Sequence, residues 1–162
     1  MSYAGITPDF RAILLTGRQT CQKFYAEYET HINPTQIAKN IAGVMQEYTV
    51  QGGVRPFGLS LLLAGMCEGK PYLYQIDPSG TYFGWKATVI GKNSINMKNF
   101  IEKRYNPDME LDDAIHTGLM TLKENYEGEM NERNIEVGVI GMDGKFRILK
   151  HSEIKDYLKE AE

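Results

Sequence analysis

Residues 51–65 read QGGVRPFGLSLLLAG, two glycines followed by Arg55-Pro56 and a nearly continuous apolar run. Glycines that follow a helical pattern are typical of a helix C-terminus, because glycine adopts the left-handed conformation without steric cost. The apolar run predicts a strand over residues 57–66 that is buried on both faces. Phosphate-binding loops run in the opposite order, from strand into helix, and continue with Gly-Lys-Ser/Thr. The stretch therefore predicts a helix-to-strand turn and no nucleotide site.

Two helices are predicted before this turn. Thr7-Pro8-Asp9 is typical of a helix start, with Thr7 as the N-cap and Pro8 as the first helical residue. Asn33-Pro34 repeats this signal. Small or apolar residues then recur every three or four positions, at Phe10, Leu14, Gly17, Cys21, Phe24 and Tyr28 in the first helix and at Ile37, Ile41, Val44 and Tyr48 in the second. Each helix therefore carries one apolar stripe.

The rest of the chain predicts more strands and then mostly helices. Strands are expected over residues 72–76 and 81–90, helices over 95–105 and 111–126, a hairpin over 135–142 and 145–149, and a last helix capped by Ser152 with Ile154, Tyr157, Leu158 and Ala161 on its apolar face. Strands that are joined directly, between pairs of helices, predict an α/β protein of the α+β kind, with an antiparallel sheet layer faced by helices. The strict strand–helix alternation of a Rossmann fold is not seen.

Composition excludes several classes of protein. At 162 residues with a formal net charge of −3, the chain fits one domain and gives no sign of a nucleic-acid or anionic-membrane partner. The sequence has no apolar run of roughly 18 residues, the length that a membrane helix needs. Cys21 and Cys67 are expected to be reduced thiols of an intracellular protein, although a single disulfide remains open.

Catalytic and metal-binding patterns are also missing from the sequence. The histidines His31, His116 and His151 have no zinc-ligand spacing, and Ser60 is not in a Gly-x-Ser-x-Gly turn. Every threonine is internal, whereas a threonine that uses its own α-amine as the base must be the first residue. We therefore expect no catalytic residue, no cofactor and no metal.

Four stretches carry a resemblance to a known family: VMQEYTVQGGVRPFGLSLLLAG, PYLYQIDPSGTYFGWKATVIGKN, FIEKRYNPDMELDDAIHTGLMTLKE and NIEVGVIGMDGKFRIL. They resemble the α-type subunits of the eukaryotic 20S proteasome, and among the paralogues the α2 type. The resemblance covers essentially the whole chain. It implies an N-terminal-nucleophile-hydrolase fold, an αββα sandwich, formed by a single domain over residues 1–162.

The resemblance also implies a function. Such subunits form the outer seven-membered rings of the barrel, gate substrate entry and dock activator complexes, and their partners are other α subunits, β subunits and activators. They support ubiquitin-dependent and other protein degradation in the cytoplasm and nucleus without cleaving peptides, because proteolysis belongs to β subunits with an N-terminal threonine. Two alternatives remain: an active threonine hydrolase of the same fold, and a free-standing interaction module.

The chain departs from this family at its start. The family's α subunits have a further segment before the first long helix, with the gating tail, an N-terminal helix, the first strands and the lysine of the activator pocket. Here the sequence begins with MSYAGITPDFR, where the family is finishing a strand. We therefore expect an N-terminally truncated fold with incomplete sheets, prone to aggregate or dependent on partners.

The first long helix, residues 8–28, matches a helix that takes part in contacts between the α and β rings of the family. The resemblance therefore implies subunit-interface roles for Asp9, Arg11 and Arg18 on the polar side of this helix.

Overall fold

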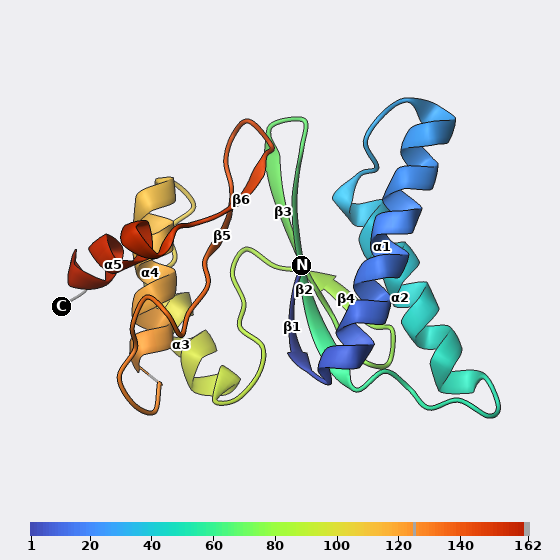
Figure 1. Cartoon of the computed structure of the whole chain (residues 1–162), viewed down its shortest axis with the longest axis horizontal. Helices are drawn as coiled ribbons and strands as arrows, with labels where there is room; N and C mark the ends of the chain where they lie inside the picture. Colours follow the sequence, from blue (N-terminus) through green and yellow to red (C-terminus); the bar gives the residue numbers. More distant parts are fainter. Residues whose placement is uncertain (125, 161–162) are drawn as a thin grey trace. The chain divides into compact units, whose positions relative to one another are not determined.

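The structure is a computed structural model that describes residues 1–124 and 126–160, and it divides into two compact units. Unit 1 is residues 1–86 and unit 2 is residues 87–162. Unit 1 contains β1 (Ser2–Gly5), α1 (Thr7–Tyr28), α2 (Pro34–Val50), β2 (Leu59–Cys67), β3 (Lys70–Ile76) and β4 (Tyr82–Gly84). Unit 2 contains α3 (Ser94–Arg104), α4 (Leu111–Glu124), β5 (Gly138–Ile140), β6 (Phe146–Ile148) and α5 (His151–Glu160). Figure 1 labels these elements.

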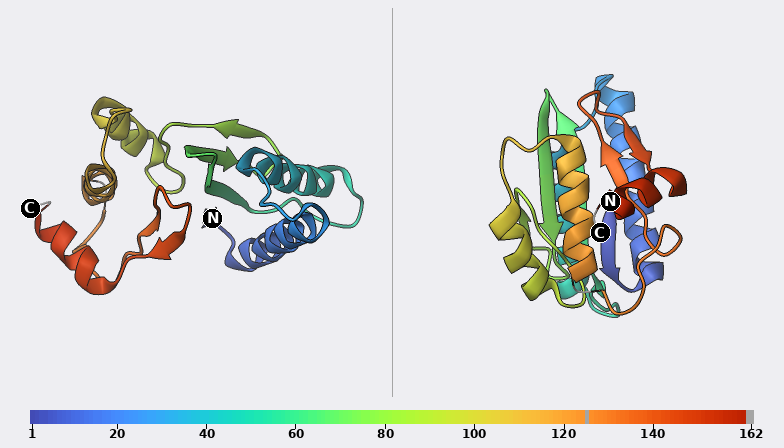
Figure 2. Two further views of the ribbon diagram at one scale, coloured as in Figure 1. Left: turned by 90° about the horizontal axis from the view of Figure 1, so that it is seen from above. Right: turned by 90° about the vertical axis from the view of Figure 1, so that its left-hand side faces the viewer.

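Unit 1 is built on an antiparallel sheet of order β1-β2-β3-β4. The register pairs Ser2 with Leu62, Leu61 with Ile76, and Ile76 with Tyr82. Helices α1 and α2 contact each other and lie on one face of this sheet, as the left view of Figure 2 shows. The predicted antiparallel sheet faced by helices is therefore confirmed in unit 1.

The core of unit 1 lies between this sheet and its two helices. Alternate residues of β2 are buried there, and the core comprises Ile13, Ile37, Ala38, Ile41, Ala42, Met45, Leu59, Leu61, Leu63 and Ile76. On the opposite face of β2, Leu62 is half-buried and Ala64 is exposed. Within unit 1 the prediction of a strand buried on both faces is therefore wrong, because α1 and α2 cover one face of the sheet and leave Ala64 exposed on the other.

The boundaries of two other elements in unit 1 also differ from the prediction. Only Tyr82–Gly84 of the predicted strand 81–90 pairs with β3. The N-cap of α1 is Ile6 and not Thr7, whose hydroxyl lies 2.9 Å from the hydroxyl of Tyr3. The predicted start of α2 is confirmed, since the Asn33 side chain accepts a 2.8 Å hydrogen bond from the Thr35 amide.

In unit 2, α4 contacts α3 and α5, and Val139 of the hairpin joins the same core. The core of this unit comprises Ile115, Leu119, Val139, Leu149 and Ile154. The predicted hairpin forms, with Val139 opposite Arg147. Its paired strands are shorter than predicted, and residues 141–145 join them in place of the expected two-residue turn. Helix α4 ends at Glu124, so Tyr126 lies beyond it, and α5 begins at His151, one residue before the predicted cap Ser152. Ala161, predicted on the apolar face of the last helix, lies outside the described residues.

Candidate functional site

Helix α1 has a buried side that fixes its position on unit 1. Ile13 and Gly17 are its buried residues. A Cβ at Gly17 would lie 3.4 Å from the Cδ1 atom of Ile41, so the absence of a side chain lets α1 approach α2 closely. The opposite side of α1 therefore faces away from α2 and the core.

The outward side of α1, here called the outer face, carries Arg11, Leu15 and Arg18. These residues recur at spacings of four and three, which places them on one side of a helix. Both arginines are exposed, and Leu15 is 57% exposed. An exposed leucine between two cations is suited to a partner that presents an apolar side chain flanked by carboxylates.

Asp9 lies on the other side of the helix and is engaged within the chain. Its Oδ1 accepts a 2.9 Å hydrogen bond from Nη2 of Arg55, and its Oδ2 accepts one of 2.7 Å from Nη1. The backbone amide of Gly58 donates a third, of 3.0 Å, to Oδ2. The Asp9 side chain is only 11% exposed, whereas that of Arg55 is 62% exposed.

These contacts determine the charge of the pair. The hydrogen bond from Arg55, followed by that from the Gly58 amide, lowers the pKa of Asp9 from its ordinary value of 3.8 to about 2. In turn, the hydrogen bond to the Asp9 carboxylate raises the pKa of Arg55 above its ordinary value. Both groups are therefore fully ionised at neutral pH, which favours a bidentate, charge-assisted contact.

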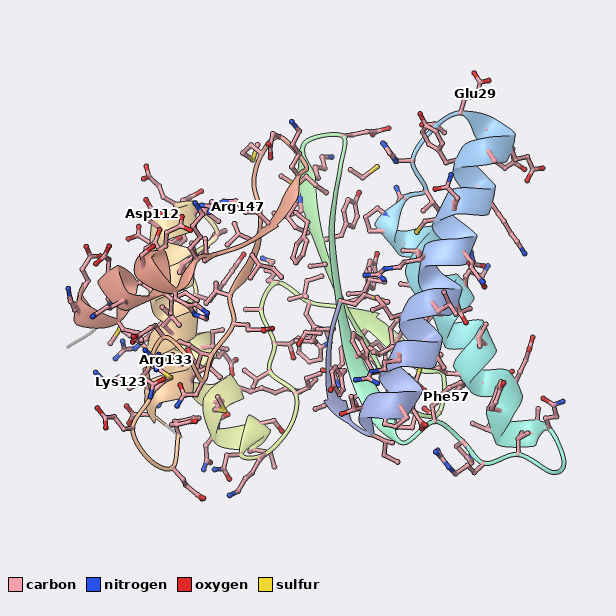
Figure 3. All side chains as sticks on the ribbon, viewed as in Figure 1. Glu29, Phe57, Asp112, Lys123, Arg133 and Arg147 are labelled. Carbon is pink, nitrogen blue, oxygen red and sulfur yellow. The ribbon has the colours of Figure 1, made fainter. Side chains whose placement is uncertain are left out.

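The backbone around this contact is closely packed. The Ile6 amide donates a 3.0 Å hydrogen bond to the carbonyl of Gly58, and Gly5, at a φ of +138°, lies directly against that carbonyl. A side chain at Gly5 would collide with this backbone. Phe57 is labelled in Figure 3 beside the start of α1, and its ring centroid lies 4.5 Å from that of Tyr48. Residues 55–58 are thus attached to the first turn of α1 and to the core.

The structure therefore separates the three residues that the sequence predicts as a group. Arg11 and Arg18 share the outer face, while Asp9 faces the segment before β2. The sequence reasoning missed Leu15 and Arg55. Leu15 was detectable as an apolar residue off the buried stripe, but no local pattern reveals a pair separated by 46 positions.

Comparison with known proteins agrees with this fold. A family model described as "Proteasome subunit" matches residues 1–140. The chain belongs to the proteasome subunit family. Proteasome subunit alpha type-2 of Oryza sativa subsp. indica is 54% identical over 160 residues, which are 99% of this chain and 68% of that protein. Proteasome subunit alpha type-2-A of Arabidopsis thaliana has the same identity and coverage. The alpha type-2 subunit of Drosophila melanogaster is 51% identical over 158 residues, which are 98% of this chain and 67% of that protein.

The other described residues of this proteasome-family chain offer no stronger site. Within residues 1–124 and 126–160, no group of three His, Cys, Asp or Glu side chains could hold a metal ion. In the same part of the chain, every helix is too short or too polar to cross a membrane. Cys21 and Cys67 are free, and burial raises the pKa of the Cys21 thiol, which disfavours the reactive thiolate. The outer face of α1 is therefore the candidate site.

Proposed function

We propose that the chain is a non-catalytic α-type subunit of the outer ring of the 20S proteasome. The observation that carries this proposal is the 54% identity, over 99% of the chain, to a protein named proteasome subunit alpha type-2. In this role the chain assembles with other α subunits and with β subunits, and contributes to gating and to activator docking. Its place of action is then the cytoplasm and nucleus.

The absence of catalysis is part of the proposal. Threonines of α1 hydrogen-bond locally, since the hydroxyls of Thr16 and Thr20 donate to the carbonyls of Ala12 and Thr16. Each is also internal and lacks the free α-amine that a threonine nucleophile uses as its base. The alternative of a threonine hydrolase is therefore not favoured. A free-standing module is disfavoured because the identity extends along nearly the whole chain.

We further propose that residues 1–162 form one domain with the αββα sandwich of the N-terminal-nucleophile hydrolases. Support comes from apolar side chains on sheet faces that no described helix of the same unit covers. In unit 1 these include Leu62 and the exposed Phe83, which share one face because both pair with Gln75. In unit 2 they are Phe146 and Ile148 of β6, both exposed. Such faces are those that a second sheet layer covers.

The subunit contact that we propose is the outer face of α1. Arg11 and Arg18 would meet carboxylates of a β subunit, and Leu15 would enter an apolar recess between them. Asp9 serves this contact indirectly, because its carboxylate is already occupied by Arg55 and Gly58.

Incorporation into 20S particles tests the proposed function. The tagged chain is expressed in cells, the 20S particle is purified through a β subunit, and the tag is measured in the particle. We expect incorporation of the chain, and its loss in Leu15→Asp and in the double variant Arg11→Glu/Arg18→Glu. Lys39→Glu, at an exposed site on α2, is the matched control and should incorporate normally. A chain that sediments only as free protein, or that hydrolyses fluorogenic peptides by itself, would contradict the proposal.

A further inference from the structure

The start of α1 is held by hydrogen bonds among Ile6, Asp9, Arg55 and Gly58, none of which belongs to the outer face. We propose that Arg55 is a positioning residue for subunit contact: through Asp9 it sets the direction in which α1 presents its outer face to a neighbouring subunit. This inference rests on the proposed function, because it assumes that the outer face meets another subunit. Neither the position of Arg55 in the sequence nor the family resemblance indicates this role.

Residues 55–58 are joined to α1 from two directions. The Ile6 amide, immediately before the helix, donates to the Gly58 carbonyl. The Gly58 amide donates back to Oδ2 of Asp9, in the first turn of the helix. Together with the guanidinium of Arg55, these bonds fix the helix start against the segment that leads into β2. The first turn therefore cannot tilt without breaking at least one of them.

The ion pair between Arg55 and Asp9 fixes orientation as well as distance. Both nitrogens Nη1 and Nη2 of Arg55 are used, each on a different oxygen of Asp9. A planar, bidentate contact of this kind constrains the angle between its partners, whereas a lysine ammonium would fix only their distance. Asp9 also lies in the first turn of α1, where a carboxylate interacts favourably with the helix dipole.

The length of α1 converts a small tilt at its start into a larger displacement of the outer face. Leu15 lies six residues beyond Asp9, which is about 9 Å along the helix axis. A tilt of about 10° at the first turn would therefore displace Leu15 by about 1.5 Å, given the rise of about 1.5 Å per residue. Well-packed interface cores are as dense as protein interiors, so a displacement of this size is enough to disrupt the contact.

Arg55 is itself exposed, so direct contact with the neighbouring subunit is the competing role, and a variant series separates the two. Asp9→Asn keeps an acceptor for the Gly58 amide but removes the charge that Arg55 binds. If Arg55 acts through Asp9, then Asp9→Asn, Arg55→Met and the double variant should have the same effect. If Arg55 contacts the neighbour directly, Asp9→Asn should leave incorporation unchanged and overturn the proposal.

The measurement is competition between the tagged variant and the wild-type chain for incorporation into 20S particles. We expect Asp9→Asn and Arg55→Met each to reduce incorporation by about fivefold, the size of effect expected for a partly exposed ion pair near the upper end of the usual range. The double variant should be no worse than either single one, and Arg55→Lys should be intermediate. Arg133→Met, in an exposed segment of unit 2 labelled in Figure 3, is the control and should compete equally with wild type.

Amide hydrogen exchange of the same chains provides a second readout. We expect faster exchange at Ile6, Gly58 and Phe10, with unchanged exchange in the paired strands β2 and β3. If the amides of β2 and β3 exchange faster to the same degree, the ion pair stabilises the fold as a whole and the positioning role is overturned. Arg55→Lys, which keeps a positive charge at residue 55, is measured beside Arg55→Met. Faster local exchange with normal incorporation overturns the positioning role too. In that case Leu15→Asp still reports separately on the proposed function.

Discussion

Gly80 lies against α2, because a Cβ at this position would come within 2.6 Å of the Ala42 carbonyl oxygen and 2.5 Å of the Gln46 Cβ. Gly80 closes the turn from β3 to β4, where its amide donates a 2.9 Å hydrogen bond to the Asp77 carbonyl. Its φ of +82° also lies in the left-handed region that favours glycine. The turn therefore requires glycine for two separate reasons, conformation and space.

Replacing this glycine should reveal both effects. We expect Gly80→Ala to lower the free energy of unfolding by about 2–4 kcal/mol, through left-handed strain and collision with α2. Gly69→Ala is the matched control, since Gly69 has a φ of +73° but a Cβ added there would meet no atom within 4 Å. It should cost about 1 kcal/mol, from strain alone. Urea denaturation measures both, and equal losses would show that the packing of the turn on α2 contributes nothing.

Acid should weaken the contact between Asp9 and Arg55. The pKa of Asp9 is lowered from 3.8 to about 2 in the folded chain, so the folded state favours the ionised carboxylate. The stability that this contributes is present above the unfolded value and is lost as the pH falls towards about 2. We expect the stability difference between wild type and Asp9→Asn to shrink between pH 4 and pH 2 in urea titrations. A difference that stays constant across this range would contradict the assignment, and Asp113→Asn, an exposed site on α4, controls for charge.

The two helix starts in unit 1 should respond differently to alanine. Asn33→Ala removes the side-chain oxygen that accepts from the Thr35 amide, and should cost about 1 kcal/mol of unfolding free energy. Thr7→Ala should cost less, because the hydroxyl of Thr7 bonds to the Tyr3 hydroxyl and caps no helix amide. Thermal unfolding of both variants measures this order. The reverse order would mean that Thr7 acts as the cap after all.

Helices α4 and α5 should separate more easily when Tyr157 loses its hydroxyl. The Tyr157 hydroxyl donates a 2.6 Å hydrogen bond to Oδ1 of Asp112, and this bond raises the pKa of Tyr157 above 10.0. Figure 3 labels Asp112 on α4. We expect Tyr157→Phe to cost at most about 1 kcal/mol, since the site is near the surface.

The pH dependence of that loss follows from the sign of the shift. A raised pKa in the folded chain means that the contribution is complete below pH 10.0 and is lost as the pH rises further and the phenol ionises. Wild type and Tyr157→Phe should therefore converge in stability in alkaline solution. Unfolding curves at pH 8 and above pH 10 test this, and a gap that widens with pH would contradict it.

Much of the fold could be predicted from local sequence patterns. The stripes through Ile37 and Ile41 and the Asp143-Gly144 turn each placed an element correctly, because period and turn chemistry are local properties. Burial on both faces of β2 was predicted wrongly, because an apolar run does not say which of its faces neighbouring helices cover. The predicted N-cap of α1 was one residue too late, because a local pattern does not show which group a hydroxyl meets. Thr7 has the chemistry of a cap, but its hydroxyl meets Tyr3 instead.

The candidate site was predictable only in part. Arg11 and Arg18 were named because the family resemblance implies a subunit contact on this helix, and helical spacing correctly places the two together on one side of α1. The same spacing says nothing of what a carboxylate meets on the other side of the helix, so Asp9 was grouped with them. Its partner Arg55 comes from a segment 46 residues away, which only the antiparallel pairing of β1 with β2 brings to the start of α1.

Trp85 gives the chain a built-in optical probe. It is the single tryptophan of the sequence, it is 42% exposed, and its amide donates a 2.8 Å hydrogen bond to the Leu73 carbonyl next to β4. Its emission therefore reports on the β3–β4 edge of unit 1, whereas far-ultraviolet circular dichroism reports on helices from α1 to α5. Coincident transitions by both signals would mean that all 162 residues unfold together. Separate transitions would resolve two independently melting halves, with the fluorescent step belonging to the N-terminal one.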